Sequence, residues 1–106
     1  MPNDSSPFFL LPLVPNAPVK KSFTAALLGV SSQLLRAANP INRGIVISNR
    51  LSATCYVSLT GSPATTDGIP IPAGGVWSWP RGVIQDIYVI APGLLVNGDI
   101  YHYEFN

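Results

Sequence analysis

The chain has 106 residues, of which 10% are charged and 47% are hydrophobic, and its formal net charge is +1. This length supports one hydrophobic core, so we expect one folded domain. The basic residues are scattered, with only Lys20 and Lys21 adjacent, whereas nucleic-acid binding needs a basic stripe with stacking aromatic residues. We therefore expect no nucleic-acid partner.

Charged residues are scarce, because an ordinary soluble domain carries about 25%. No formal charge occurs between Leu51 and Thr66, although a free monomer normally keeps charged side chains on its surface for solubility. We interpret the scarcity as surface that neighbouring subunits cover. A surface rich in Ser, Thr, Asn and Gln is the alternative.

Residues 1–19 form a segment that contains five of the eleven prolines. Proline removes a backbone donor and disfavours helix in the preceding residue. We therefore expect an extended arm near polyproline II, with a reach of roughly 50 Å at ~3.1 Å per residue. Its apolar run lacks a basic leader and is far shorter than the ~20 residues of a membrane helix, so we expect neither a targeting signal nor a membrane partner.

The arm carries large apolar side chains, whereas a disordered tail would be polar and charged. We predict that it docks onto a partner and becomes ordered on assembly. The predicted partner-binding side chains are Phe8, Phe9, Leu10, Leu11, Leu13 and Val14. In one alternative the arm packs against its own domain. In another, the Pro-x-x-Pro patterns that begin at Pro12 and Pro15 bind adaptor domains.

Residues 20–106 are typical of a β domain, because short apolar and β-branched runs alternate with Gly, Pro, Asn and Ser. The predicted strands span residues 22–28, 33–37, 44–49, 54–59, 69–71, 76–79, 86–91, 94–96 and 100–105. Residues 24–38 also contain helix formers, but Gly29 interrupts the helical face and we favour strand. Asn97 and Gly98 suit a tight turn, since both tolerate positive φ. The pattern predicts a small β-sandwich or jelly-roll-like domain.

Several turn residues are predicted to hold the domain together. Asn39 and Pro40 should initiate a turn, because Asn can bond its own backbone and Pro fixes φ. The guanidinium of Arg43 could bind loop carbonyls as a structural fastener, or contact another subunit. Asn49 is expected to cap the turn that follows its strand. Two glycines, Gly74 and Gly75, permit a sharp reversal before the next strand.

A series of short motifs continues from residue 38 to residue 91. In order they are Ala38-Asn39-Pro40-x-x-Arg43, Ile45-Val46-Ile47-x-Asn49, Tyr56-Val57-Ser58, Gly68-Ile69-Pro70-Ile71, Ala73-Gly74-Gly75 and Ile87-Tyr88-Val89-Ile90-Ala91. Their order and spacing resemble those of small bacteriophage virion proteins, namely capsid decoration, head-fibre and related minor structural domains. The resemblance covers roughly residues 30–92 and excludes the arm. It implies a β-sandwich that sits on a capsid or tail and has no catalytic role.

Few side chains suggest chemistry. Cys55 is the only cysteine, so neither an intrachain disulfide nor a cysteine-based zinc site can form. It lies within a predicted strand, and we expect a buried, inert thiol. His102 and Glu104 share one strand face and could begin a metal or acid–base site, but no third ligand is close in sequence. We therefore predict no catalytic residue, no metal site and no cofactor.

Two groups of aromatic residues could be either core or binding surface. Tyr101, Tyr103 and Phe105 share the strand face opposite His102, and we favour core over an exposed stripe. Trp77 and Trp79 also share a face and could stack on a glycan or contact another subunit. Because each indole buries a large area, we favour packing for this pair.

Taken with these observations, the resemblance implies a non-enzymatic phage virion protein, in the first instance a capsid decoration or cement protein that binds and stabilises the major capsid protein shell. We expect a homo-oligomer, a trimer before a dimer, located in virions assembled in the host cytoplasm. The alternative is a tail or head-fibre module that contacts glycans on the host surface.

Overall fold

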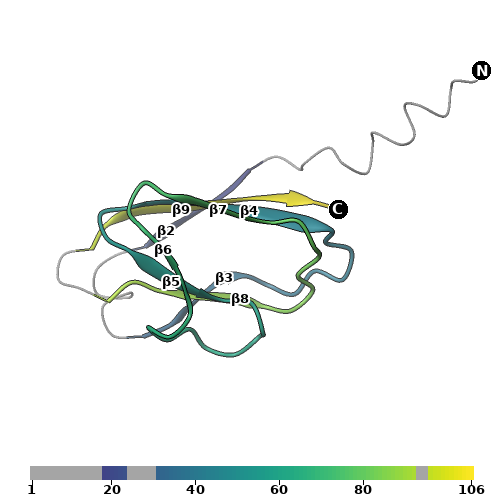
Figure 1. The fold of residues 1–106 in the computed structure, drawn as a ribbon, viewed down its shortest axis with the longest axis horizontal. Helices are drawn as coiled ribbons and strands as arrows, with labels where there is room; N and C mark the ends of the chain where they lie inside the picture. Colours follow the sequence, from purple (N-terminus) through teal and green to yellow (C-terminus); the bar gives the residue numbers. More distant parts are fainter. Residues whose placement is uncertain (1–17, 24–30, 93–95) are drawn as a thin grey trace, which may run out of the picture.

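Eight strands make up the described part of the computed structural model, which comprises residues 18–23, 31–92 and 96–106. They are β2 (Val19–Phe23), β3 (Gln33–Arg36), β4 (Gly44–Leu51), β5 (Cys55–Ser58), β6 (Ile69–Ile71), β7 (Val76–Trp79), β8 (Ile87–Ile90) and β9 (Gly98–Phe105). These strands form two packed four-stranded sheets, ordered β2-β9-β4-β7 and β3-β8-β5-β6 (Figure 1). We name them the β9 sheet and the β8 sheet. The predicted all-β sandwich is confirmed.

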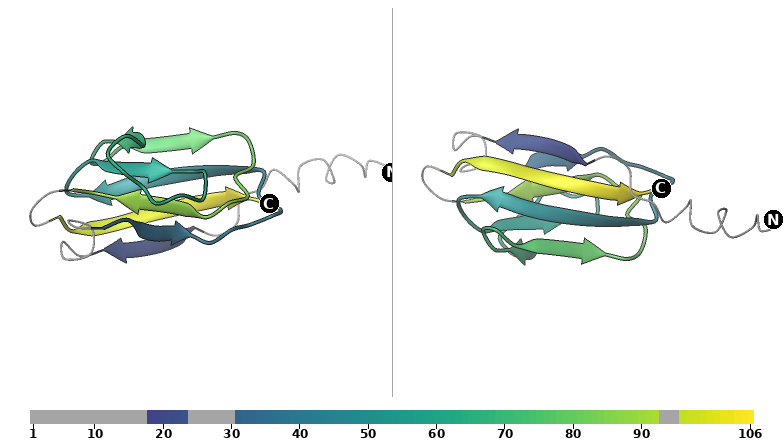
Figure 2. Two further views of the ribbon diagram at one scale, coloured as in Figure 1. Left: turned by 90° about the horizontal axis from the view of Figure 1, so that it is seen from below. Right: turned by 90° about the horizontal axis from the view of Figure 1, so that it is seen from above.

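The strand pairs are nested within one another. β2 pairs with β9, β3 with β8, β4 with β7 and β5 with β6, all antiparallel. Two further antiparallel pairs, β4 with β9 and β5 with β8, join these ribbons into sheets. This is the order of a jelly roll, in which a long antiparallel ribbon folds over into two layers. Figure 2 shows the β9 sheet from above, with β9 in yellow between β2 and β4.

The core lies between the sheets and follows from the period-two alternation of each strand. On β4, Ile45 and Ile47 point inward and are at most 1% exposed. On β8, Ile87 and Val89 face them and are fully buried. Burial of a side chain of this size contributes about 1.5–3 kcal/mol, so this layer of branched residues supplies much of the driving force for folding.

The observed strands agree with the predicted ones to within a few residues. β6 and β7 have the predicted bounds, whereas β4 continues to Leu51. β2 begins at Val19, which the sequence assigned to the arm. Residues 24–28 of the first predicted strand and residues 94–95 of another lie outside the described residues, as does most of the arm. Val96, the last residue of the predicted strand 94–96, does not belong to a strand.

Gly98 does not lie in the predicted tight turn. It is the first residue of β9 and faces Leu51 at the end of β4. A Cβ atom there would lie 2.4 Å from the carbonyl oxygen of Arg50, and φ is 112°. A glycine is therefore needed for the close approach of two strands. The predicted reversal before β7 is present, with the Gly75 amide donating to the Pro72 carbonyl at 2.8 Å and Gly74 at φ 77°.

The arm joins the β9 sheet at the end where β9 finishes. Val19, the first residue of β2, is paired with His102, and Gly44, the first residue of β4, is paired with Phe105. The amide of Arg43 donates to the Phe105 carbonyl at 2.7 Å. The start of β2, the last residues of β9 and the turn at Asn39 and Pro40, which we call the Asn-Pro turn, therefore lie at the same end of the sandwich.

Candidate functional site

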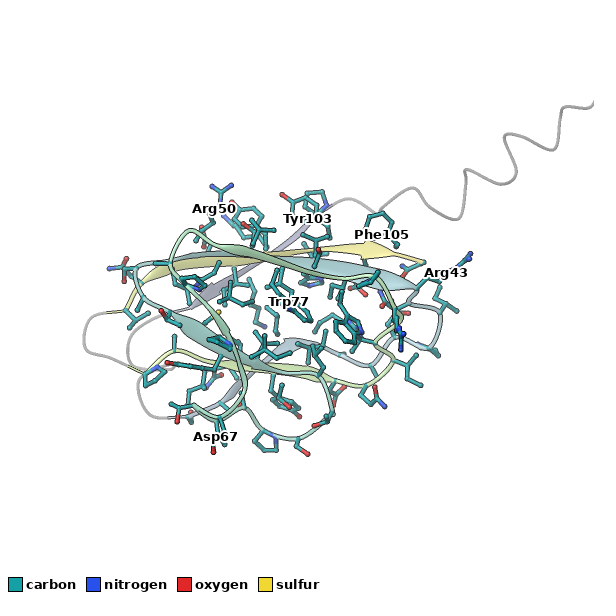
Figure 3. All side chains as sticks on the ribbon, viewed as in Figure 1. Arg43, Arg50, Asp67, Trp77, Tyr103 and Phe105 are labelled. Carbon is teal, nitrogen blue, oxygen red and sulfur yellow. The ribbon has the colours of Figure 1, made fainter. Side chains whose placement is uncertain are left out.

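The outward side of β9 carries a row of aromatic side chains, Tyr101, Tyr103 and Phe105, which we call the aromatic face. All three are partly exposed, whereas the alternating His102 and Glu104 are buried between the sheets. Figure 3 shows Tyr103 and Phe105 above the β9 sheet, on the side away from the β8 sheet. The expectation that these aromatic residues form core is therefore wrong.

Small and polar residues surround the aromatic face on the neighbouring strands. Val46 is paired with Tyr103, and Ser48 with Tyr101. The Cζ atom of Arg50 lies 5.9 Å from the centre of the Tyr101 ring, a cation–π geometry. Lys20 pairs loosely with Asp99 at 4.0 Å. Charge is thus concentrated near Tyr101, and the middle of the face is apolar.

A groove of about 500 Å³ lies at the Phe105 end of the aromatic face. Residues from β4, β7, β9 and the adjoining loops line it, among them Arg43, Gly44, Val46, Ser78, Pro80 and Phe105. Gly44 faces Phe105 across the β4–β9 pair and is itself buried, with the backbone of Trp79 and Pro80 close to the position of its missing side chain. Arg43 is exposed, which places a positive charge at an otherwise largely apolar groove.

The tryptophan pair closes one edge of the sandwich. Trp77 and Trp79 on β7 are paired with Ile47 and Ile45, so both lie on the core side of the sheet. Their rings stack with a centroid separation of 5.5 Å and an interplanar angle of 11°. Trp77 packs against the core, and Trp79 is 37% exposed. One face of each indole is thus covered by the other indole, and Trp79 is the more accessible of the two residues.

A buried polar cluster joins the sheets near the Asn-Pro turn. Its centre is Glu104 on β9, whose Oε1 lies 3.2 Å from Nε of Arg36 on β3 and whose Oε2 lies 3.2 Å from Nδ1 of His102. The side-chain amides of Asn39 and Asn42 donate to the same Oε1 at 3.0 and 2.9 Å. The sequence analysis correctly placed His102 and Glu104 on the same face of one strand. It did not identify Arg36 or Asn42 as members of the cluster.

Arg36 also fastens the loop that precedes β8. Its guanidinium donates to the carbonyl groups of Ala37, Val83 and Gln85. The side chain of Arg43, to which the sequence assigned this type of bond, is exposed instead. The one available signal for Arg36 was its position directly after two leucines in a predicted strand, since a charged residue is rarely buried without a partner.

The cluster is arranged for structure, because Arg36 and His102 lie at ion-pair distance from the Glu104 carboxylate and two asparagine amides donate to it. Burial lowers the pKa of His102 below its ordinary value, with Glu104 opposing and Arg36 reinforcing that effect. Burial also lowers the pKa of Arg36, against the opposing charges of Glu104 and Asp86. The contact of Arg36 on β3 with Glu104 on β9 therefore ties the two sheets together, and a histidine that is neutral near pH 7 lies beside it.

The predicted turn residues Asn39 and Asn49 both make local bonds. The Ile41 amide donates to Oδ1 of Asn39 at 3.3 Å, and the Leu51 amide donates to Oδ1 of Asn49 at 2.9 Å. Asn49 is fully buried, and its Nδ2 also donates to the carbonyl of Ile71 at 2.8 Å. It therefore links the end of β4 to the end of β6 in the opposite sheet, a longer-range role than a turn cap.

Cys55 is a buried thiol at the start of β5. It is 0% exposed, and burial raises its pKa to about 12. A thiol in this state is protonated and a poor nucleophile.

Within residues 18–23, 31–92 and 96–106, no group of three or more His, Cys, Asp or Glu side chains is placed to hold a metal ion. In the same part of the chain, no helix has the length and hydropathy needed to cross a membrane. The predicted partner-binding side chains from Phe8 to Val14 lie outside the described residues. The chain matches no protein-family model, and no curated protein matches it in sequence.

Proposed function

We propose that this chain is a non-enzymatic structural subunit of a bacteriophage particle, a decoration or cement protein that binds the shell of major capsid protein. It acts as a homo-oligomer, located in virions assembled in the host cytoplasm. The observation that carries the proposal is the position of the aromatic face on β9, directly beside β2, the strand into which the apolar arm leads.

The aromatic face has the composition of a protein-binding surface. Tyrosine, phenylalanine and arginine are enriched at protein–protein interfaces, and tyrosine and arginine supply many of the side chains that dominate binding energy. Tyr101 and Tyr103 present rings to the outside, and Arg50 lies against the first of them. A partner that covers this face would bury aromatic area with few charges to desolvate.

The end of the sandwich beside the arm adds further exposed apolar area. Ile41 in the Asn-Pro turn is 64% exposed, and Ile84 in the loop before β8 is 51% exposed. The Asn39 amide donates to the Ile84 carbonyl at 3.0 Å, so these two loops are held together. One partner could therefore contact the arm, this end and the aromatic face at once.

The fold supports the proposal by analogy only. Jelly rolls occur in viral capsid proteins and in lectins, and fold alone does not determine function. The analogy agrees with the resemblance of residues 30–92 to phage virion domains.

Co-sedimentation with capsid shells of the phage that encodes the chain tests the proposal. Replacement of Tyr101 and Tyr103 by Ser should weaken shell binding at least about tenfold, equivalent to about 1.4 kcal/mol. Tyr56→Ser with Tyr88→Ser is the matched control, because both are partly exposed tyrosines of the β8 sheet. Failure of the wild-type chain to bind shells, or equal loss in both double variants, would overturn it.

A full-length variant tests whether the arm takes part in shell binding. It carries Ser in place of Phe8, Phe9, Leu10, Leu11, Leu13 and Val14. The proposal expects a folded protein that no longer binds shells. Full shell binding by this variant would exclude the arm from docking.

A second candidate is a tail or head-fibre module that binds host glycans, favoured by the accessible ring of Trp79. Trp79→Ala is the appropriate variant, because Trp77 packs against the core. Binding to a glycan array that is lost in Trp79→Ala would favour this candidate over shell binding.

A further inference from the structure

We propose that the groove beside Phe105 binds the proline-rich segment 7–15 of a second copy of this chain, so that copies assemble by exchanging arms. The inference rests on the proposed function in one respect, that the N-terminal segment is a docking arm. It adds the identity of the arm's partner, while Tyr101 and Tyr103 of the aromatic face remain available to the shell.

The groove has the shape and chemistry that such a segment requires. Phe105, Pro80 and Val46 supply apolar lining, and Gly44 adds backbone to the groove wall without a side chain that would fill it. Its volume of about 500 Å³ suits a few side chains rather than a whole domain. Polyproline II segments bind grooves lined by aromatic and apolar residues, because their backbone is already extended and loses little entropy on binding.

The arm has the matching composition. Residues 7–15 contain three prolines and six large apolar residues and carry no formal charge. The only charged side chain before residue 20 is Asp4, three residues before this segment. Arg43 at the groove is exposed and forms no ion pair with any residue of the described ranges. Asp4 of the bound arm can therefore pair with a guanidinium that has no other acidic partner there.

The spacing of the prolines favours a second copy over the chain's own groove. Pro12, Pro15 and Pro18 recur every three residues, which is the period of polyproline II. An arm extended in this way places residues 7–15 roughly 12–37 Å before Val19, at ~3.1 Å per residue. Phe105 lies only three residues beyond His102, the partner of Val19, which is about 10 Å along the strand direction. A straight arm thus passes beyond its own sandwich, and return to its own groove would require a reversal within the proline series.

Exchange of this kind is a head-to-tail contact between different surfaces of two copies. Such contacts close into rings when the rotation between copies allows it. The expected trimer is one such closed ring, in which each copy gives one arm and receives another.

The test is a complementation experiment on full-length variants, read by light scattering after size exclusion. The arm variant carries Phe8→Ser, Phe9→Ser and Leu11→Ser; the groove variant carries Phe105→Ser. Tyr101→Ser is the matched control, because it lies on the same face of β9 and outside the groove. We expect wild type and Tyr101→Ser to be oligomers, and each of the other variants to be an 11.3 kDa monomer.

Mixing the two monomeric variants should produce a complex, because one retains an intact groove and the other an intact arm. Phe105→Leu keeps an apolar side chain in the groove, controls for unfolding of the Phe105→Ser variant and should remain oligomeric. An excess of a synthetic peptide of residues 5–17 should compete with the arm and dissociate the wild type. A monomeric wild type, an oligomeric Phe105→Ser, or a mixture that stays monomeric would each overturn arm exchange. A monomeric wild type that still binds shells would overturn this inference and the homo-oligomer, and would leave shell binding as the proposed function.

Discussion

Arg36 and Glu104 belong to opposite sheets and meet in the interior, with Nε and Oε1 3.2 Å apart. Both side chains are almost fully buried, and Asn39, Asn42 and His102 occupy the remaining positions around the carboxylate. Buried ion pairs are costly to desolvate, and removal of one partner is more damaging than loss of an exposed pair. The pair therefore makes the packing of the sheets specific.

Glu104→Gln should lower the free energy of unfolding by about 3 kcal/mol, because it leaves the Arg36 guanidinium buried without an opposite charge. Urea denaturation followed by tryptophan fluorescence measures this change. Lys20→Gln is the control, since the Lys20–Asp99 pair is exposed and 4.0 Å long and should contribute less than about 1 kcal/mol. Equal stability of Glu104→Gln and wild type would show that the pair adds nothing.

His102 should make stability depend on pH in the mildly acidic range. Its pKa is lowered in the folded chain, chiefly by burial, so the unfolded chain binds the proton more readily. Stability from this residue is complete above the unfolded pKa of about 6.5. It decreases as the pH falls from there towards the lowered folded pKa. Denaturation midpoints between pH 5 and pH 8 measure the effect.

His102→Gln is the natural reference for that measurement, because His102 is the only histidine. The difference between the two unfolding profiles should appear below about pH 6.5. Profiles that remain parallel through this range would contradict the predicted titration.

Asn49→Ala should destabilise the domain by about 3 kcal/mol, because it leaves the Leu51 amide and the Ile71 carbonyl without their partner in the interior. Thermal unfolding compares the variant with Asn97→Ala. Asn97 is exposed, and its replacement should cost less than about 0.5 kcal/mol. A small effect at Asn49 would mean that water replaces the amide.

Cys55 should react with thiol reagents only when the chain unfolds. With a pKa of about 12, only about one folded thiol in ten thousand is ionised at pH 8. The reaction with a chromogenic disulfide should be complete within minutes in denaturant and far slower without it. Rapid labelling of the folded chain would show that β5 opens locally.

The strands could be predicted because their boundaries carry strong local signals. β6 and β7 are short apolar runs enclosed by proline and glycine, and their bounds agree with the structure. The buried isoleucines of β4 alternate with residues of the outward side. Signals of this kind extend over a few residues, so they predict where strands lie along the chain but not which strands pair.

The buried cluster and the aromatic face could not be predicted without knowing which strands pair with which. On β9, hydrophobicity alone places Tyr103 and Phe105 inward and Glu104 outward, which is the reverse of the observed arrangement. Glu104 lies inside because Arg36, far away in sequence, reaches it from the other sheet. A pairing between strands at opposite ends of the chain leaves no mark in the local pattern of either strand.

The nested pairing also has a consequence for synthesis. β9 is the last strand of the described chain, yet it lies in the interior of its sheet with β2 on one side and β4 on the other. The sheet therefore cannot close while the ribosome still holds residues 98–105, and the earlier strands must wait as an open ribbon. Domains with many such distant pairings fold slowly, so the unpaired edges of the earlier strands stay open to aggregation until β9 inserts between β2 and β4.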